Sequence, residues 1–207
     1  MQSTGSMVSA LLSALLLVII AGCGKGEVSH YAADQYPRKL SEWGLIQQHD
    51  NTLVIHPSTT VYALNTALFS DYAQKLRTIY IPQGQAATYH PVKTFDFPVG
   101  SIITKTFFYP LNADQIMLTD ASWSGDPRDI DIRKHRLVET RLLVKQADGW
   151  DALPYVWSGD DAYLSLTGDL QQFDLGSGDT LNYLVPSKNQ CASCHATNHT
   201  DGKLLPI

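Results

Sequence analysis

The strongest constraint on this chain is a five-residue run near its C-terminus, Cys191-Ala192-Ser193-Cys194-His195. A C-x-x-C-H run is typical of covalent c-type haem attachment, because each cysteine sulfur can form a thioether with a haem vinyl group. The histidine can bind the iron from one side. On a helix with about 100° per residue, the three side chains share one face, as a flat macrocycle requires. The sequence therefore predicts Cys191 and Cys194 as haem attachment sites and His195 as an axial iron ligand.

Two other interpretations of this run are less favoured. A zinc site is conceivable because His199 follows His195 by four residues. However, Cys194 and His195 are adjacent, tetrahedral zinc sites usually separate their ligand pairs by a loop, and no other cysteine completes the set. A redox dithiol needs only C-x-x-C, but such motifs normally lie near the start of a βαβ unit, whereas this one follows β structure.

The N-terminus predicts export. Residues 8–21 are apolar apart from two serines, and the stretch is shorter than the about 20 residues that span a bilayer, so it fits the apolar core of a signal peptide. It ends Ile20-Ala21-Gly22-Cys23, which resembles the lipobox of bacterial lipoproteins. That resemblance implies removal of residues 1–22, lipidation of Cys23 and anchoring by acyl chains. No Lys or Arg precedes the apolar stretch, so a plain cleaved signal or an N-terminal anchor helix is the alternative.

Export and charge narrow the classes of partner. Either kind of signal places the chain on the periplasmic side of the cell envelope, where c-type haems are attached. The first 22 residues carry no charged side chain, so the net charge of −5 belongs to the remainder. An acidic surface argues against nucleic acid as a partner and suits docking to basic redox partner proteins of the envelope. The three cysteines are then all assigned, and none is left for a disulfide.

The pattern after the signal predicts a mainly β (α+β) haem domain over residues 38–207, preceded by a polar tether over 23–37. A short helix is expected over 42–47 with Ser41 as its cap. Runs rich in Val, Ile, Thr, Tyr and Phe then alternate with turn residues, which is typical of an antiparallel sheet. The expected strands are residues 78–82, 101–109, 137–145, 152–157, 163–166 and 181–185. A short helix after Pro186 is expected to carry the haem motif.

Two features inside this β domain bear on its faces and loops. In the strand over 137–145, simple alternation places Val138, Thr140, Leu142 and Val144 on one face and the intervening residues on the other. The polar connection over 112–136 is long for a compact domain, which predicts a functional or mobile loop.

Eight segments carry a family resemblance: residues 36–45, 64–66, 68–73, 95–100, 105–110, 139–143, 153–157 and 189–195. They include Tyr-Pro-Arg-Lys-Leu-Ser-Glu-Trp-Gly-Leu at 36–45 and Phe-Asp-Phe-Pro-Val-Gly at 95–100. These segments are similar to bacterial envelope proteins described as dihaem c-type cytochromes. Those proteins continue further and carry a second haem motif, so the resemblance implies that this chain corresponds to their N-terminal, single-haem part and is expected to be a truncated form.

A second, more distant resemblance rests on the pattern Phe97-Pro98-x-Gly100-x-x-Ile103-x-Lys105, on Leu143-Val144-Lys145 and Gly149-Trp150, and on the terminal C-x-x-C-H. It is similar to cytochrome c′-beta and to the lysine-crosslinked, hydroxylamine-oxidising cytochromes. The resemblance implies a sheet packed over one haem face and an open second side of the iron. It also makes Lys105 the candidate for a crosslink to the haem edge, against the more common interpretation as an ordinary strand lysine.

The second iron ligand decides the function, because a six-coordinate iron favours electron transfer and an open one favours binding or chemistry. Met117, His90, His135 and His199 are candidates, and none is assigned. The favoured function is covalent haem c binding with single-electron transfer. The alternative is a haem enzyme or gas-binding protein acting on nitric oxide, hydroxylamine or peroxide, and a third is an envelope protein with a vestigial haem site. No nucleophile elbow, phosphate loop or H-E-x-x-H helix is present.

Overall fold

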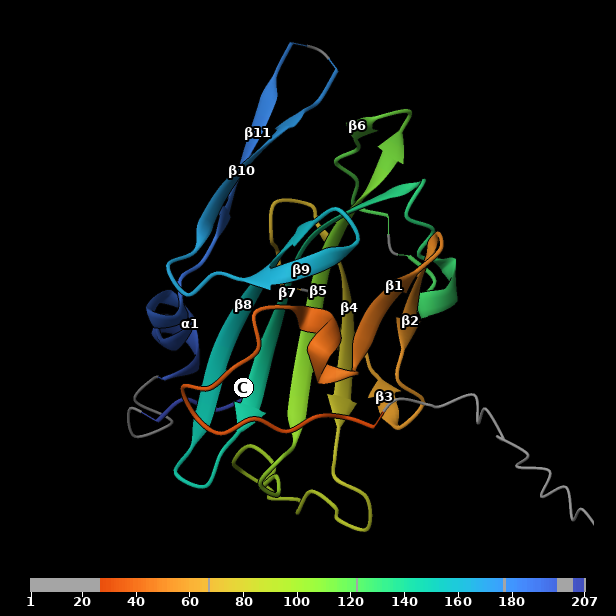
Figure 1. The fold of residues 1–207 in the computed structure, drawn as a ribbon. Helices are drawn as coiled ribbons and strands as arrows, with labels where there is room; N and C mark the ends of the chain where they lie inside the picture. Colours follow the sequence, from red (N-terminus) through yellow and green to blue (C-terminus); the bar gives the residue numbers. More distant parts are fainter. Residues whose placement is uncertain (1–26, 67, 122, 177, 197–202, 207) are drawn as a thin grey trace, which may run out of the picture.

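The computed structural model describes residues 27–66, 68–121, 123–176, 178–196 and 203–206. The predicted signal over 1–22, Cys23 and His199 lie outside these residues. The fold is mainly β, with antiparallel sheets and one short C-terminal helix, as predicted (Figure 1). No helix in the described part of the chain is both long and apolar enough to cross a membrane.

One antiparallel sheet organises the domain, with its strands in the order β3-β4-β5-β7-β8-β9. Their bounds are Thr59–Val61, Gln74–Tyr80, Ile102–Asn112, His135–Lys145, Trp150–Ser158 and Asp161–Leu164. A two-residue strand, β6 (Gln115–Ile116), pairs with the end of β5. The central pair β5 and β7 is rich in β-branched and aromatic residues, which favour a pleated surface buried on both sides.

The first face of this sheet is covered by N-terminal segments. These are the 3-10 turn η1 (Leu40–Trp43) and the hairpin of β1 (Ile46–His49) and β2 (Thr52–Ile55). Trp43 is fully buried there and donates its Nε1–H to the hydroxyl of Tyr155 at 2.8 Å. That hydroxyl in turn donates to the carbonyl of Pro37 at 2.9 Å, so the indole is held in the core without an unsatisfied polar atom.

The prediction of a helix over 42–47 is wrong. Gly44 ends η1 with a φ of +71°, and a Cβ at this position would lie 2.8 Å from the carbonyl oxygen of Glu27. The chain then continues as β1. Ser41 lies inside the turn instead of capping a helix, and its hydroxyl donates to Asp161 at 2.6 Å. A glycine in the left-handed conformation stops a helix at once, which the apolar pattern alone did not indicate.

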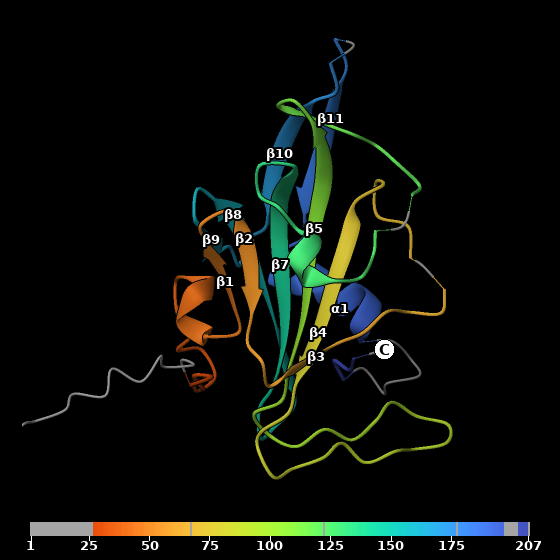
Figure 2. The same cartoon turned by 90° about the vertical axis from the view of Figure 1, so that its right-hand side faces the viewer.

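The second face of the sheet is covered by C-terminal segments (Figure 2). These are the hairpin of β10 (Asp169–Asp174) and β11 (Thr180–Val185), and the helix α1 (Lys188–His195). A second core cluster lies beneath the hairpin and includes Phe107, Tyr109, Val138 and Tyr183. Figure 2 shows η1, β1 and β2 on one side of the sheet and α1 on the other.

A register shift in β7 changes which side chains face each side. Phe107 pairs with Glu139 and Phe108 pairs with Leu137, so Val138 is an extra residue in β7. Leu142 and Val144 belong to the first core, but Val138 belongs to the second, and Leu137 to the first. The predicted common face of Val138 with Thr140, Leu142 and Val144 is therefore wrong at Val138, because an inserted residue reverses the alternation.

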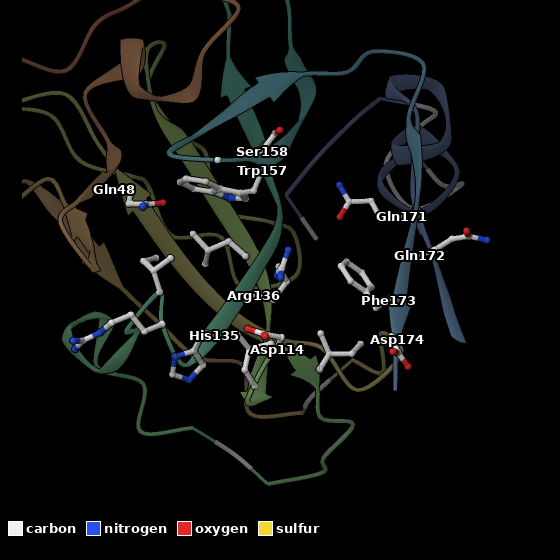
Figure 3. Close-up of a pocket in the computed structure, with 16 residues that line it drawn as sticks. Gln48, Asp114, His135, Arg136, Trp157, Ser158, Gln171, Gln172, Phe173 and Asp174 are labelled. Atoms are coloured by element: carbon white, nitrogen blue, oxygen red, sulfur yellow. The ribbon is translucent and has the colours of Figure 1, made fainter. Parts of the chain in front are cut away.

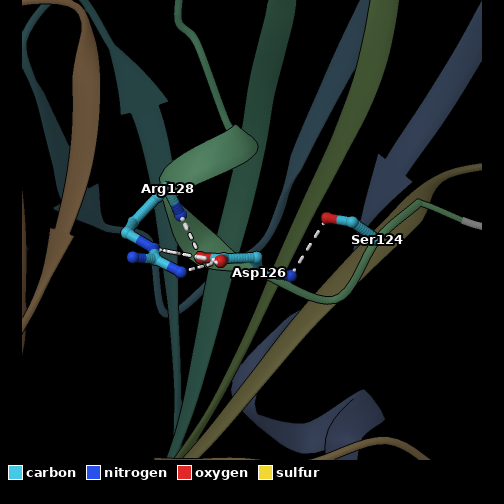
Figure 4. Close-up of polar contacts among 3 residues, drawn as sticks. All are labelled: Ser124, Asp126 and Arg128. Carbon is cyan, nitrogen blue, oxygen red and sulfur yellow. Dashed lines mark hydrogen bonds and ion pairs between the residues drawn. The ribbon is translucent and has the colours of Figure 1, made fainter.

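The long connection before β7 is held by local contacts. The 3-10 turn η2 (Pro127–Asp129) begins after Asp126, whose carboxylate accepts from the backbone N–H of Arg128 at 2.9 Å and pairs with its guanidinium (Figure 4). The backbone N–H of Asp126 donates to the Ser124 hydroxyl at 3.1 Å. Trp123 donates its Nε1–H to the carbonyl of Lys75 at 3.1 Å, which fixes this segment to β4.

Candidate functional site

The helix α1 begins where the sequence supplies a reciprocal cap. The backbone N–H of Gln190 donates to the Ser187 hydroxyl at 3.3 Å, and the backbone N–H of Ser187 donates to Gln190 Oε1 at 2.8 Å. This S-x-x-Q arrangement satisfies two donors that an uncapped helix leaves unpaired. Pro186 precedes the cap and ends β11. The predicted short helix is thus present, and it contains Cys191, Cys194 and His195.

Two contacts fix the start of α1 to the sheet. Lys188 Nζ lies 3.1 Å from Asp151 Oδ1 at the start of β8. The backbone N–H of Lys188 donates to the carbonyl of Leu166 at 2.9 Å. The turn beside it depends on Gly168, which has a φ of +80°, because a Cβ there would lie 2.5 Å from the carbonyl oxygen of Val185. Only glycine tolerates both conditions, and the helix is therefore placed against β8.

The two cysteines of α1 have free thiols and different environments. Cys191 is half-buried and Cys194 is exposed. Burial raises the pKa of the Cys191 thiol, while the positive charge of Arg141 lowers that pKa and the negative charge of Glu139 raises it. Because Arg141 and Glu139 belong to β7, Cys191 faces the second side of the sheet. The Cys191 thiol is therefore close enough to these two charged groups for their charges to act on its pKa.

His195 is held by a segment further along the chain. Its Nδ1 lies 2.8 Å from the carbonyl oxygen of Leu205, and the backbone N–H of Leu205 donates to the carbonyl of His195 at 3.0 Å. A carbonyl oxygen can only accept, so Nδ1 carries the proton and the lone pair of a neutral ring lies on Nε2. This is the tautomer and the backbone contact that iron- and zinc-ligating histidines commonly use.

Three transverse rows of side chains lie on the sheet face beside α1. Directly paired residues of antiparallel strands point to the same side, so the pairings of β4, β5, β7 and β8 define the rows. The rows are Ile79, Ile103, Leu143 and Ala152; Arg77, Lys105, Arg141 and Pro154; and Lys75, Phe107, Glu139 and Val156. An apolar row therefore lies next to a cationic one.

Lys105 lies at the centre of the cationic row. Burial and, after it, the positive charges of Arg77, Arg141 and Lys75 together lower the pKa of its ammonium to about 8, while the negative charge of Glu139 opposes this shift. Its Nζ also lies 4.8 Å from the ring centroid of Phe107. The lysine named by the resemblance to crosslinked cytochromes is thus on the face where Cys191 lies. The crosslink itself stays a prediction.

Glu139 is the buried carboxylate of this face. It binds the guanidinium of Arg141 through both oxygens, at 2.7 Å and 2.5 Å. It also accepts from the Tyr183 hydroxyl at 2.6 Å, and burial followed by the charge of Glu139 raises the pKa of that tyrosine. The sequence alone did not identify Arg77, Arg141, Glu139 or Tyr183 as residues of this face. Charged residues at alternate positions of otherwise apolar strands were the signal that could have found them.

Two of the candidate second ligands, His135 and Met117, lie away from Lys105 and α1. His135 packs its ring against Phe108, which belongs to the core on the first face. Met117 follows β6, which pairs with the end of β5 at Leu111, six residues beyond Lys105. That separation is roughly 20 Å along the strand. His90 is exposed in the connection between β4 and β5.

A cleft elsewhere on the domain does not contain the motif. It has a volume of about 700 Å³ and lies between the ends of β5, β7 and β8 and the strand β10 (Figure 3). Its labelled side chains include Trp157, Phe173 and His135. In the described part of the chain, no three His, Cys, Asp or Glu side chains gather as a metal site. The zinc alternative depends on His199, which lies outside that part.

Comparison with known proteins adds no family: no family model, no curated protein and no solved structure matches this chain. The resemblance to dihaem and β-sheet cytochromes therefore stays a prediction from the quoted residues. The residues themselves fit a covalent haem. Cys191 and Cys194 lie on one short helix, and Leu205 fixes the proton of His195 on Nδ1.

Proposed function

We propose that the chain binds one haem c through Cys191 and Cys194, with His195 as an axial iron ligand, and transfers single electrons. The contact between His195 Nδ1 and the Leu205 carbonyl, at 2.8 Å, carries the proposal. It leaves the lone pair of a neutral ring on Nε2 and holds the ring in one orientation. A free lone pair and a fixed ring are both needed to bind the iron. The haem would supply a redox-active iron whose potential depends on its ligands, hydrogen bonds and burial.

The face beside α1 supports this proposal because it suits one side of a macrocycle. Ile103 is buried and Ile79 and Leu143 are half-buried, so they form an apolar row on the face beside α1. The connections over 62–73 and 81–101 extend to the same side of the sheet as α1 (Figure 2). Large exposed apolar side chains of these two connections are Leu64, Leu68, Phe69, Tyr72, Tyr89, Val92, Phe95 and Val99. We expect them to cover the haem and to exclude water from it.

The proposed location is the periplasmic side of the cell envelope, with Cys23 as a lipid anchor. The supporting observation is the apolar stretch over 8–21 followed by Ile20-Ala21-Gly22-Cys23. A lipid-anchored cytochrome would exchange electrons with other redox proteins of the envelope, and the net charge of −5 favours basic partners.

A haem protein with an open iron site is the second candidate function. The observation in its favour is that His135 packs on the first face and that Met117 follows β6 at the far end of β5, away from Lys105. An iron with His195 alone would bind small ligands such as nitric oxide, hydroxylamine or peroxide on its other side. The resemblance to cytochrome c′-beta implies the same arrangement.

One spectroscopic experiment separates the two functions. The haem-loaded protein is reduced and oxidised, its spin state is recorded, and carbon monoxide is added to the reduced form. Electron transfer predicts a low-spin, six-coordinate iron that cycles reversibly and does not bind carbon monoxide. A high-spin iron that binds carbon monoxide at once would reject simple electron transfer and support the open site. A second measurement with Met117→Leu would show whether that sulfur ligates the iron in the loaded protein.

A further inference from the structure

The row of Arg77, Lys105 and Arg141 places three cations side by side on one face of the sheet. Arg77 pairs with Lys105 and Lys105 pairs with Arg141, in direct cross-strand register. Directly opposed side chains have Cβ atoms about 5 Å apart, and like charges in such pairs destabilise a sheet. Lys75 adds a fourth positive charge from β4, and the charge of Lys75 also lowers the pKa of Lys105. A fold rarely retains such an arrangement without a counter-ion.

Among the described residues, only one of these cations has an anionic partner. Glu139 neutralises Arg141, which it binds through both oxygens. Among the ion pairs and side-chain hydrogen bonds of the described residues, none involves the guanidinium of Arg77 or the ammonium of Lys105. Arg77 is only 8% exposed, so bulk water screens its charge poorly. Two desolvated cations therefore lie next to each other, and in the described part of the chain neither forms an ion pair. The negative charge of Glu139 acts on Lys105, but that carboxylate is already bound to Arg141.

The neighbourhood of the row indicates the shape of the missing anion. Cys191 of α1 lies close enough to Arg141 for each to affect the pKa of the other. On the adjacent transverse row, Ile103 and Leu143 offer apolar surface. A ligand that fits both rows is flat and apolar over most of its area and carries carboxylates at one edge. Guanidinium groups bind carboxylates through two parallel hydrogen bonds, which makes Arg77 the strongest single donor.

We propose that Arg77 and Lys105, with Arg141 beside them, form a carboxylate-binding site on the second face of the sheet. The carboxylates are the propionates of the haem attached to α1, so this assignment rests on the proposed function. A free carboxylate or similar small oxyanion has the same chemistry and is the alternative source. Arg77 and Lys105 would hold the propionates while Cys191 and Cys194 hold the vinyl carbons, and the two sets of contacts together would fix the orientation of the haem.

The test uses the haem-loaded protein and compares Arg77→Leu and Lys105→Met with Lys134→Met, which removes an exposed charge just before β7. Covalent haem content should equal the wild-type value in all three, because the thioether bonds do not involve these cations. We expect Arg77→Leu and Lys105→Met to lower the reduction potential, since a nearby cation disfavours the ferric state. We also expect a shifted propionate bending band in resonance Raman spectra. Lys134→Met should change neither, and Arg77→Lys should retain most of the wild-type potential.

Acetate distinguishes the two sources of carboxylate. Thermal unfolding of the loaded wild type is measured with acetate or with chloride at equal ionic strength. If propionates occupy the row, acetate has no specific effect. Acetate-dependent stabilisation that Arg77→Leu abolishes would overturn the propionate assignment and give the row to a free carboxylate. Unchanged potential and Raman bands in both variants, with no acetate effect, would overturn the site. A wild type without covalent haem would instead contradict the proposed function.

Discussion

His195 and Leu205 hold each other by two hydrogen bonds across ten positions of the chain. Nδ1 of the imidazole donates to the Leu205 carbonyl at 2.8 Å, and the Leu205 N–H donates to the His195 carbonyl at 3.0 Å. These two bonds hold His195, the last residue of α1, in place through Leu205, which lies outside the helix. A histidine whose ring N–H is bound in this way is a stronger ligand, because the hydrogen bond increases its basicity.

Leu205→Pro removes the N–H that donates to the His195 carbonyl. Without that bond, the hydrogen bond from His195 Nδ1 to the carbonyl of residue 205 should weaken. A less basic imidazole stabilises the ferric state less, so we expect the reduction potential of the loaded protein to rise. A shift on the order of 60 mV corresponds to a tenfold change in the ratio of ferric to ferrous stability. Leu205→Ala keeps the N–H and serves as the control in the same spectroelectrochemical titration. Equal potentials in the two variants would show that Leu205 does not tune His195.

Tyr183→Phe removes the hydroxyl that donates to buried Glu139 at 2.6 Å. The carboxylate would keep Arg141 but lose one partner, and the hairpin of β10 and β11 would lose a polar link to β7. We expect the free energy of unfolding to fall by about 1–3 kcal/mol, as for the loss of a hydrogen bond to a buried charged group. Urea unfolding monitored by tryptophan fluorescence gives this value. Tyr89→Phe, at an exposed position, should cost almost nothing, and equal losses in both variants would contradict the account.

The lowered pKa of Lys105 predicts that the stability of the haem-free chain depends on pH. The haem-free chain is obtained as the Cys191→Ala/Cys194→Ala variant. The pKa of Lys105 is lowered from 10.5 to about 8 by burial and by Arg77, so between these values the unfolded chain binds more protons than the folded one. The free energy of unfolding therefore rises with pH in this window, before tyrosines ionise near pH 10. We expect a rise of roughly 1 kcal/mol between pH 8 and pH 10, after allowance for solvent screening. In chemical denaturation, Lys105→Met should flatten this rise and Lys134→Met should leave it. A flat profile without the substitution would show that Lys105 is not desolvated.

The central strands could be predicted from the sequence because their apolar runs are bounded by turn residues. The strand expected over 101–109 is present as Ile102–Asn112, and that over 137–145 as His135–Lys145. β10 was not predicted, because Asp169–Asp174 is polar and mostly exposed. Only its pairing with β11 in the folded structure identifies it as a strand. β4 was placed too late, at 78–82, because Lys75 and Arg77 interrupt the apolar pattern of a strand that spans Gln74–Tyr80.

The site could be predicted only where local spacing specifies it. The C-x-x-C-H spacing identifies Cys191, Cys194 and His195 without knowledge of the fold, and a short helix carrying them was expected after Pro186. Arg77, Lys105 and Arg141 are 28 and 36 residues apart in the sequence, and only the cross-strand register brings them together. The bulge at Val138 likewise depends on pairing with Phe107 and Phe108, which alternation within one strand does not reveal.

Haem attachment is the most direct test of the central claim. The full chain is expressed in a bacterium with cytochrome c maturation machinery, beside the Cys191→Ala/Cys194→Ala variant. The matured proteins are then compared by pyridine haemochrome spectra and intact mass. We expect one covalent haem per wild-type chain, with the spectrum of two thioether bonds, and no haem on the variant. A wild-type chain that matures to the same length with both thiols free and no haem would contradict the claim.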